Sequence, residues 1–221
     1  MPVEGLTAPP RSRTLLIMTA LPNRDRRSER REATRLEIVD AAWRVAREDG
    51  LAAVTLREIG RLVGMQAPSL YSHFPSKNAI YDAMFGQAWQ QIVTWFDDRP
   101  PMPSAPRRAL LWLAEGFFDF AVADVARYQL MNRAAVPGFQ PSEDAYAHSV
   151  AAYGRMRDVL RAAGVRRAAD LDLWTAITGG AVDQQLANEP DGTRWRRQLA
   201  RLVDMFADEV GVAGPKLRRA R

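Results

Sequence analysis

Apolar residues recur every three or four positions along most of this chain, and no segment shows the strict alternation that is typical of a β-strand. The pattern therefore predicts an all-α protein built from amphipathic helices. Capping residues, glycines and prolines separate the helices and set their expected ends. In chain order, the predicted helices are Arg35–Glu48, Leu56–Val63, Ala67–Phe74, Lys77–Trp95, Arg107–Asp124, Ala126–Ala134, Ser142–Ala163, Leu171–Asn188 and Thr193–Val210.

Breaks in this pattern indicate how the chain is divided. Four prolines after the fourth helix, at positions 100, 101, 103 and 106, predict a stiff linker. Residues 1–30 are rich in arginine and proline and lack a helical period, which predicts a disordered basic N-terminal arm, with Met18 as an alternative start. We therefore expect an arm over 1–30, a small helical domain over 31–80, a larger helical domain over 81–213 and a basic tail over 214–221.

The segment Thr55–Lys77 has the local signals of two short helices joined by a tight turn. Thr55 and Glu58 form a Thr-x-x-Glu capping box that opens the first helix. Gly64 can take the positive φ angle that ends this helix, and Pro68 fits the first turn of the next one. This order of elements is typical of a helix-turn-helix, which reads DNA with its second helix.

The second helix of this segment has one apolar and one polar side. Leu70 and Phe74 lie four residues apart, so their side packs against the other helices. The opposite side then exposes short and polar residues, which let a helix lie deep in the major groove of DNA. These residues are Gln66, Ala67, Ser69, Tyr71, Ser72 and His73.

The same segment resembles the DNA-binding domain of the TetR family of bacterial transcriptional regulators. Members of that family carry a pattern close to G-V-S-x-x-T-L-Y-x-H-F-x-S-K-x-x-L. This chain has Gly64-Met-Gln-Ala-Pro-Ser-Leu-Tyr-Ser-His-Phe-Pro-Ser-Lys77, followed by Ile80. Gln66 stands in place of the usual capping Ser, which weakens the expected cap, and Ser69 stands in place of the usual Thr. The resemblance covers roughly Arg35–Met84.

The resemblance implies an all-α fold with an N-terminal three-helix helix-turn-helix domain, which binds DNA, and a C-terminal helical domain for ligand binding and dimerisation. It implies a cytoplasmic, ligand-responsive transcriptional regulator, a repressor that binds a palindromic operator in double-stranded DNA as a homodimer. A small apolar ligand would release this repressor from its operator. The alternative is a DNA-binding protein of the same fold that organises the chromosome and has no effector ligand.

The residues expected to contact DNA lie on the second helix of the motif and at the ends of its neighbours. Tyr71, His73 and Lys77 offer hydrogen-bond donors to phosphate, and Gln66 can pair with adenine. The full set is Thr55, Arg57, Gln66, Ala67, Pro68, Ser69, Tyr71, Ser72, His73 and Lys77. Six arginines within Arg24–Arg35 fit two alternatives equally, a DNA-binding arm in the minor groove or on phosphates, and a solvated extension of the first helix.

The larger domain is rich in aromatic residues, which are usually core residues when they recur at helical spacing. The family resemblance implies a ligand cavity among them, lined by Trp89, Trp112, Phe117, Tyr128, Asn132, His148, Tyr153 and Trp174. The last two helices are expected to form an antiparallel hairpin, whose apolar residues cover more than one face. These residues either contact a second copy of the chain or pack inside one protomer, and they are Leu171, Trp174, Ile177, Leu199, Leu202 and Phe206.

The charge distribution agrees with a DNA-binding head on a separate body. The 221 residues carry a formal net charge of +5. Residues 1–80 have 13 basic and 9 acidic side chains, whereas residues 81–213 have 14 and 17. A basic head on an acidic body fits a protein that approaches nucleic acid with one end, and differences of this size also fit a plain scatter of solvated charge.

Composition argues against several other classes of protein. The chain has no cysteine and only two histidines, so it offers neither disulfides nor a readable metal site. No glycine-rich phosphate loop or nucleophile elbow is present, so we expect no catalytic residues, no enzymatic activity and no cofactor. No apolar run approaches the ~18 residues of a membrane-spanning helix, so no membrane association is expected.

Overall fold

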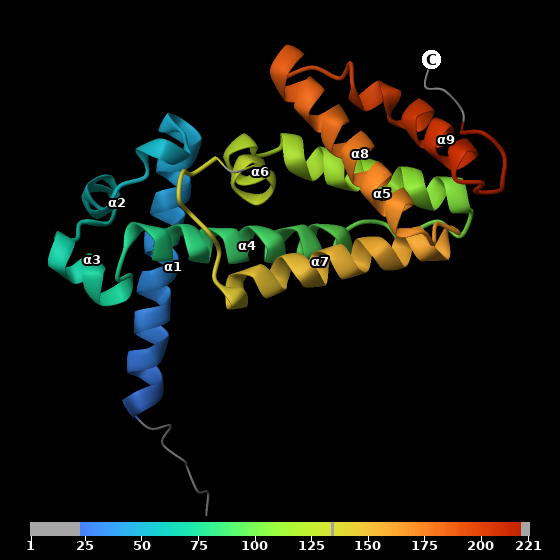
Figure 1. Cartoon of the computed structure of the whole chain (residues 1–221). Coiled ribbons are helices and arrows are strands. Elements are labelled where there is room, and N and C mark those ends of the chain that lie inside the picture. Colours follow the sequence, from blue (N-terminus) through green and yellow to red (C-terminus); the bar gives the residue numbers. More distant parts are fainter. Residues whose placement is uncertain (1–22, 134, 218–221) are drawn as a thin grey trace, which may run out of the picture.

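The computed structural model describes residues 23–133 and 135–217, and within these ranges the chain forms helices and no β-strand. The all-α prediction is therefore confirmed. The α-helices, shown in Figure 1, are α1 (Asn23–Asp49), α2 (Leu56–Val63), α3 (Ala67–His73), α4 (Lys77–Asp97), α5 (Pro106–Val122), α6 (Val125–Asn132), α7 (Glu143–Ala162), α8 (Ala168–Asn188) and α9 (Leu199–Glu209). None of these helices combines the length and the apolar character needed to cross a membrane.

Helix α1 begins much earlier than the sequence pattern predicts. It starts at Asn23 rather than Arg35, so the prediction of a disordered arm is wrong for residues 23–30. Periodicity missed this part because it carries charged residues and no apolar stripe. Arginine and glutamate nevertheless favour helix, and opposite charges three or four residues apart add stability, as in the Glu32–Arg35 pair. The rest of the predicted arm, residues 1–22, and residues 218–221 of the predicted tail lie outside the described residues.

The last predicted helix, residues 193–210, is also shorter in the structure. The 3₁₀ helix Arg196–Gln198 precedes α9, which begins only at Leu199. Side chains of α8 and its end hold the connection in a turn. The Trp195 N–H donates to Gln185 Oε1 at 3.0 Å, and the Arg194 N–H donates to Glu189 Oε2 at 3.0 Å. These bonds satisfy two backbone donors of the connecting segment and so stabilise the turn before α9.

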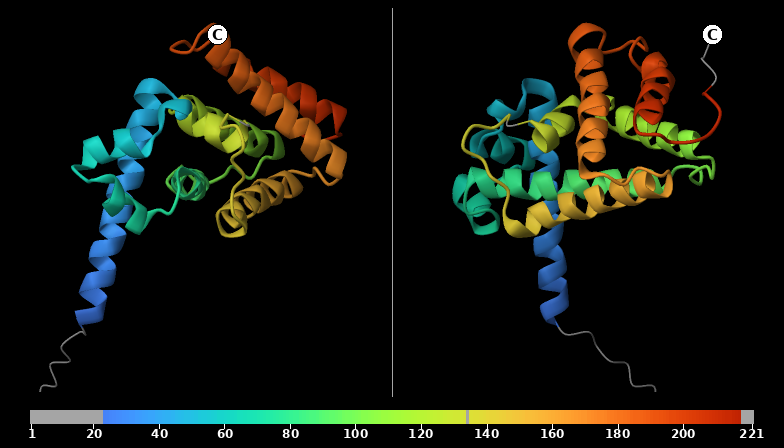
Figure 2. Two further views of the ribbon diagram at one scale, coloured as in Figure 1. Left: turned by 60° about the vertical axis from the view of Figure 1, so that its left-hand side comes forward. Right: turned by 45° about the vertical axis from the view of Figure 1, so that its right-hand side comes forward.

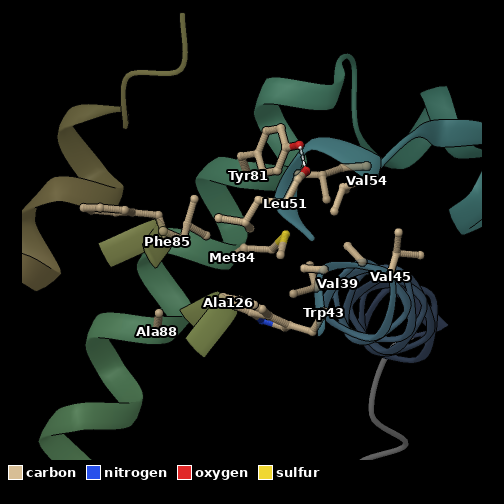
Figure 3. Close-up of a cluster of buried hydrophobic side chains, with 14 of the residues drawn as sticks. Val39, Trp43, Val45, Leu51, Val54, Tyr81, Met84, Phe85, Ala88 and Ala126 are labelled. Atoms are coloured by element: carbon tan, nitrogen blue, oxygen red, sulfur yellow. Dashed lines mark hydrogen bonds between the residues drawn. The ribbon is translucent and has the colours of Figure 1, made fainter. Parts of the chain in front are cut away.

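Helices α1, α2 and α3 and the first half of α4 share one hydrophobic core, which we call the reader core. Figure 3 shows α4 directing Tyr81 and Met84 toward α1 and the short 3₁₀ helix Leu51–Ala53. The Tyr81 hydroxyl donates to the Leu51 carbonyl, and Trp43 Nε1 donates to Gln87 Oε1 at 2.6 Å. Fully buried side chains from all four helices fill this core, including Ile38, Ala42, Ile59, Leu70, Ile80 and Met84.

In the remainder of the chain, which we call the body, α4 and α7 form a parallel pair. They lie side by side in both Figure 1 and Figure 2, and they have more contacts with each other than any other pair of helices. Near their starts, the N–H and hydroxyl of Ser142 donate to the Asp82 carboxylate at 2.6 and 2.7 Å. Near their ends, Arg155 Nη1 donates to Asp97 Oδ1 at 2.6 Å. Helix α5 packs against α4 and α7 as well as against the hairpin of α8 and α9.

Helix α4 belongs to the reader and to the body at the same time. It begins three residues after Phe74, which caps the C-terminus of α3, and runs to Asp97 beside α7. The domain boundary expected at residue 80 therefore falls inside a continuous helix. A second connection joins α1 to the N-terminus of α6, where Arg47 Nε donates to Asp124 Oδ2 at 2.8 Å. The two parts of the chain are thus linked by a shared helix and a lateral ion pair.

The packing of α2 on the following turn predicts that Gly60 cannot be replaced without cost. A Cβ atom on Gly60 would lie 2.6 Å from the Met65 carbonyl oxygen and 3.2 Å from Leu70 Cδ1. We expect Gly60→Ala to lower the free energy of unfolding by about 1–3 kcal/mol, because the backbone must shift. Gly154→Ala in α7 is the control, because a Cβ atom there meets nothing within 4 Å. We expect this control to raise the free energy of unfolding by about 0.4–1 kcal/mol, since alanine restricts the unfolded chain. Urea unfolding followed by circular dichroism measures both, and an unchanged stability of Gly60→Ala would contradict this packing.

Candidate nucleic-acid interface and ligand cavity

The turn between α2 and α3 forms as its local sequence predicts. Thr55 Oγ1 accepts a hydrogen bond from the Glu58 N–H at 3.2 Å and so caps α2. Gly64 ends α2 in the left-handed region with a φ of 68°. Only half of the expected capping box is present, because the Glu58 carboxylate pairs with Arg61 at 3.0 Å instead of bonding back to Thr55. The result is a tight corner that fixes the direction in which α3 leaves α2.

Helix α3 is held by its apolar side and presents its polar side to solvent. Leu70 is completely buried and Phe74 is nearly so. Tyr71, on the opposite side, has 52% of its surface exposed, which is unusual for a tyrosine. The exposed members of the predicted DNA-contacting set are Thr55, Arg57, Gln66, Ala67, Pro68, Ser69, Tyr71 and Ser72, and the half-buried ones are His73 and Lys77.

Gln66 occupies the N-cap position of α3 but does not cap it. Its backbone is extended, as a cap requires, yet its side chain makes no hydrogen bond to the first turn. Pro68 lies in the first turn of α3, as the sequence predicts. The Gln66 amide is therefore available to a base edge, at the cost of a weaker start to the helix.

The start of α4 combines a capped helix N-terminus with a lysine. Ser76 Oγ accepts from the Ala79 N–H at 3.1 Å, which caps the helix. Lys77 Nζ lies 5.2 Å from the centre of the Tyr81 ring, so a cation–π contact positions its charge. Backbone N–H groups, the helix dipole and this ammonium together favour an anion such as a DNA phosphate.

Two arginines of α1 bind the C-terminus of α3, and the sequence pattern did not single them out for this role. Arg31 Nη2 donates to the Ser72 carbonyl at 3.0 Å, and Arg35 Nη1 donates to the His73 carbonyl. The Arg35 guanidinium also lies 4.1 Å from the centre of the Phe74 ring. Cations are favourable at a helix C-terminus because its last carbonyls lack helical partners. Arginines spaced four residues apart in α1 were the available signal.

The body contains a cavity of about 370 Å³ bounded mainly by α4, α5, α7 and α8. Its wall is mostly aromatic and aliphatic. The predicted ligand-binding residues that line it are Trp89, Trp112, Phe117, Asn132, Tyr153 and Trp174. Sequence reasoning missed Ile92, Phe96, Asp97, Ala152, Arg155, Met156, Asp158, Thr175 and Thr178, which also line it. All of them except Phe96 are non-aromatic, so the search for aromatic residues did not select them. They come together only because helices that are far apart in the sequence pack side by side.

Tyr128 and His148, which were predicted to contact a ligand, lie outside the cavity lining. The Tyr128 hydroxyl donates to Asp183 Oδ1 at 2.9 Å, and burial raises the pKa of this tyrosine to about 12. The His148 ring lies in the interface between α4 and α7, next to Gln90, and a Cβ on Gly86 would be 3.3 Å from its Cδ2. The buried Tyr128 and the half-buried His148 thus make contacts between helices of the body.

Polar groups in the cavity wall are few and mostly paired. The Arg155 guanidinium pairs with the exposed Asp97 carboxylate, and the Thr178 hydroxyl donates to the Trp174 carbonyl at 2.9 Å. Asp158 adds a second carboxylate, whereas the Trp89 indole N–H is buried without a hydrogen-bond partner among the described residues. The wall therefore offers aromatic surface with a slight excess of negative charge.

Of the two alternatives for the apolar residues of the last hairpin, four residues follow the second and pack inside one protomer. Leu171, Trp174, Leu199 and Phe206 are at most 9% exposed within a single protomer. Trp174 and Phe206 pack edge to face, with ring centres 5.1 Å apart. Ile177 and Leu202 are half-buried, and the residues that α8 and α9 expose are instead Leu173 and Met205. The sequence could not separate the two faces because both carry apolar residues.

The missing cap of α3 predicts that Gln66→Ser stabilises the protein. A serine hydroxyl at this position can accept from the first turn, as Thr55 and Ser76 do for their helices. We expect the free energy of unfolding to rise by about 0.5–1 kcal/mol. Thermal unfolding measures it, with Gln66→Ala as the control that removes the amide without adding a cap. A serine variant no more stable than the alanine variant would contradict this account of the N-cap.

Sequence comparisons place the reader among known DNA-binding domains. Residues 38–84 match the family model described as "Bacterial regulatory proteins, tetR family". The HTH-type transcriptional repressor KstR2 of Rhodococcus jostii (strain RHA1) is 31% identical over 103 residues, which is 43% of this chain and 48% of that protein. The chain thus spans about half the length of the curated relative that it matches.

Structural comparisons extend the likeness to nearly the whole fold. The putative regulatory protein SCO4313 aligns over 82% of this chain and 98% of its own, with a TM-score of 0.66 and 21% identity. The multidrug binding protein EbrR, solved with imidazole, aligns over 84% and 95%, with a TM-score of 0.61 and 17% identity. Identities this low establish a common fold alone. With the motif at Gly64–Lys77, the family model shows that residues 38–84 of this chain belong to the tetR family of bacterial regulatory proteins.

Proposed function

We propose that this protein is a ligand-responsive transcriptional regulator, a repressor that binds a palindromic operator as a homodimer and leaves it when a small apolar molecule binds. The observation that carries the proposal is the exposed polar side of α3. Its opposite side is anchored by Leu70 in the reader core, and its C-terminus is fixed by Arg31 and Arg35. A helix that is anchored by one side and exposed to solvent on the other is suited to enter the major groove.

The residues along α3 suggest how the groove is read. Ala67, Pro68 and Ser69 have short side chains at its N-terminal end, so the helix axis can come close to the base edges. Gln66 is suited to a paired hydrogen bond with adenine. Tyr71 in the second half of α3 and Lys77 at the start of α4 offer a hydroxyl and an ammonium to phosphates, which fix the register of the helix on the duplex.

The outer face of α8 and α9 supports a homodimer. Leu173 is 38% exposed and Met205 is 58% exposed, so each helix of the hairpin offers a large apolar side chain to a partner. A two-fold pairing of this face would present two copies of α3. Two-fold readers bind half-sites whose centres are about 34–36 Å apart or a multiple of that distance.

The cavity supports a small, mainly apolar effector. Its volume of about 370 Å³ falls within the roughly 300–1,000 Å³ that is common for small-molecule sites. Three tryptophans in the wall, Trp89, Trp112 and Trp174, favour an aromatic or aliphatic molecule over an anion. The multidrug binding protein EbrR, which shares the fold, was solved with imidazole. The cavity favours a ligand-responsive regulator over a chromosome-organising protein that has no effector.

Helix α4 provides the connection between effector and operator. Trp89, Ile92 and Phe96 on its second half line the cavity, and its first residue, Lys77, lies beside α3. An effector that binds more tightly when α4 is displaced would favour a spacing of the two readers that does not fit the operator. It can do so only through its difference in affinity for the two conformations.

Replacing Tyr71 tests the DNA-reading face. We expect Tyr71→Ala to weaken operator binding by about tenfold or more, because a hydrogen bond to a charged phosphate contributes ~1.5–3 kcal/mol. Tyr146→Ala is the matched control, since Tyr146 on α7 is 55% exposed and far along the chain from the reader. Electrophoretic mobility shifts measure affinity, and light scattering measures the oligomeric state. Loss of the dimer with Tyr71→Ala would mean that this residue has been assigned to the wrong surface.

Filling the cavity tests the effector site. Ala152 lines the cavity, whereas its neighbour Ala151 is exposed, so Ala152→Trp fills the cavity and Ala151→Trp is the control. We expect Ala152→Trp to weaken the binding of Nile red, a neutral apolar fluorophore, by about tenfold, equivalent to ~1.4 kcal/mol. Fluorescence titration gives the dissociation constants. Equal dye affinity in the two variants would show that the dye binds elsewhere and remove the support for this site.

A further inference from the structure

The first two turns of α1 stand clear of the rest of the described chain. Figure 1 and Figure 2 show the N-terminal half of α1 extending beyond every other helix. Arg26, Arg27, Arg30 and Arg31 on this part are all exposed. Glu29 is exposed on the same segment, so residues 26–31 carry four arginines and one glutamate, a net charge of +3. The extension therefore presents net positive charge to the surroundings.

The position of this extension relative to α3 is fixed. Arg31 and Arg35 bind the Ser72 and His73 carbonyls at the C-terminus of α3, and Arg35 stacks on Phe74. The described part of α1 is one continuous helix from Asn23 to Asp49. The contacts of Arg31 and Arg35 with α3 therefore set the orientation of the extension relative to α3. The extension is a continuous part of α1 and not a separate arm.

The arginine spacing carries the basic surface past the end of α3. Arg27, Arg31 and Arg35 are four residues apart, so they lie along one side of α1, the side that contacts α3. At 1.5 Å per residue, Arg27 lies about 6 Å beyond Arg31 along the helix axis. Arg26 and Arg30 flank this line. The charge next to the C-terminus of α3 thus continues for at least one further turn, where no other described helix lies.

The diameter of a helix decides between the alternatives for contact with DNA. An α-helix with its side chains is about 10–12 Å wide, whereas the minor groove of B-DNA is about 6 Å wide. Residues 23–30 are helical, so this part of the chain does not fit the minor groove as an extended arm would. Arginines on a helix can instead contact the phosphates along one edge of the groove.

We infer that the N-terminal extension of α1 is a second DNA-binding element, which lies along the phosphate backbone beside the half-site read by α3, with Arg26, Arg27 and Arg30 as its phosphate contacts. The inference rests on the proposed function in one respect, since it takes α3 to be in the major groove. The extension adds affinity that does not depend on base sequence. It also lengthens the DNA segment that each protomer covers.

Salt dependence tests this inference, because every phosphate contact releases a counterion. The variant replaces Arg26, Arg27 and Arg30 with alanine, which keeps a strong helix former at each position. The control replaces three exposed arginines of the body, Arg108, Arg161 and Arg166, with alanine and so changes the net charge equally. The probe is a DNA duplex that the wild-type protein recovers from a random-sequence library. The binding constant of each protein for this duplex is measured at several salt concentrations between about 50 and 200 mM.

Each lost phosphate contact lowers the slope of log K against log salt by about 0.9, so three arginines in each of two protomers lower it by up to about 5. We expect this decrease in the α1 variant, an unchanged slope in the control and the same preferred sequence for all three proteins. A slope equal to that of the control, or a change of oligomeric state confined to the α1 variant, overturns the inference. If the wild-type protein recovers no preferred duplex, the proposed function fails instead, and a plain random duplex then tests the extension separately.

Discussion

Helix α4 runs from the core around α1, α2 and α3 to the wall of the cavity, and both the reader and the body depend on its position. Its first half places Tyr81 and Met84 in the reader core, and its second half places Ile92 in the cavity wall. It has 21 residues, which at 1.5 Å each span about 30 Å without a break. Packed cores resist deformation, so a continuous helix of this kind is suited to transmit a displacement from the cavity to the reader, as the proposed function requires.

Polar contacts keep α4 in a single register against its neighbours. The Asp82 carboxylate accepts from Ser142 near the start of α7, and Asp97 pairs with Arg155 further along it. The second pair is also part of the cavity wall, so a ligand that disturbs it acts on the attachment of α4 as well as on the volume of the cavity. The contact of Arg47 with Asp124 adds a lateral connection from α1 to α6.

The sequence predicts the parts of this fold that depend on local interactions. Thr55, Gly64 and Ser76 act at helix ends as their side chains or conformational freedom dictate, and these neighbouring signals placed α2, α3 and α4 correctly. It could not predict features that depend on partners distant in the chain. The extension of α1 has no apolar stripe, and its anchoring depends on carbonyl groups of Ser72 and His73, about forty residues away. The buried side of the last hairpin was likewise undetermined, because α5 decides which of two apolar faces turns inward.

We propose that α3 reads a specific DNA sequence as one half of a two-fold pair. The most direct measurement is the selection of genomic DNA fragments by the purified full-length chain at a stated salt concentration, followed by sequencing of the fragments that remain bound. The account predicts a small number of strongly enriched sites that share an inverted repeat, with half-site centres about one helical turn, ~34–36 Å, or a multiple of it apart. Enrichment that follows only fragment length, with no shared repeat, would contradict it.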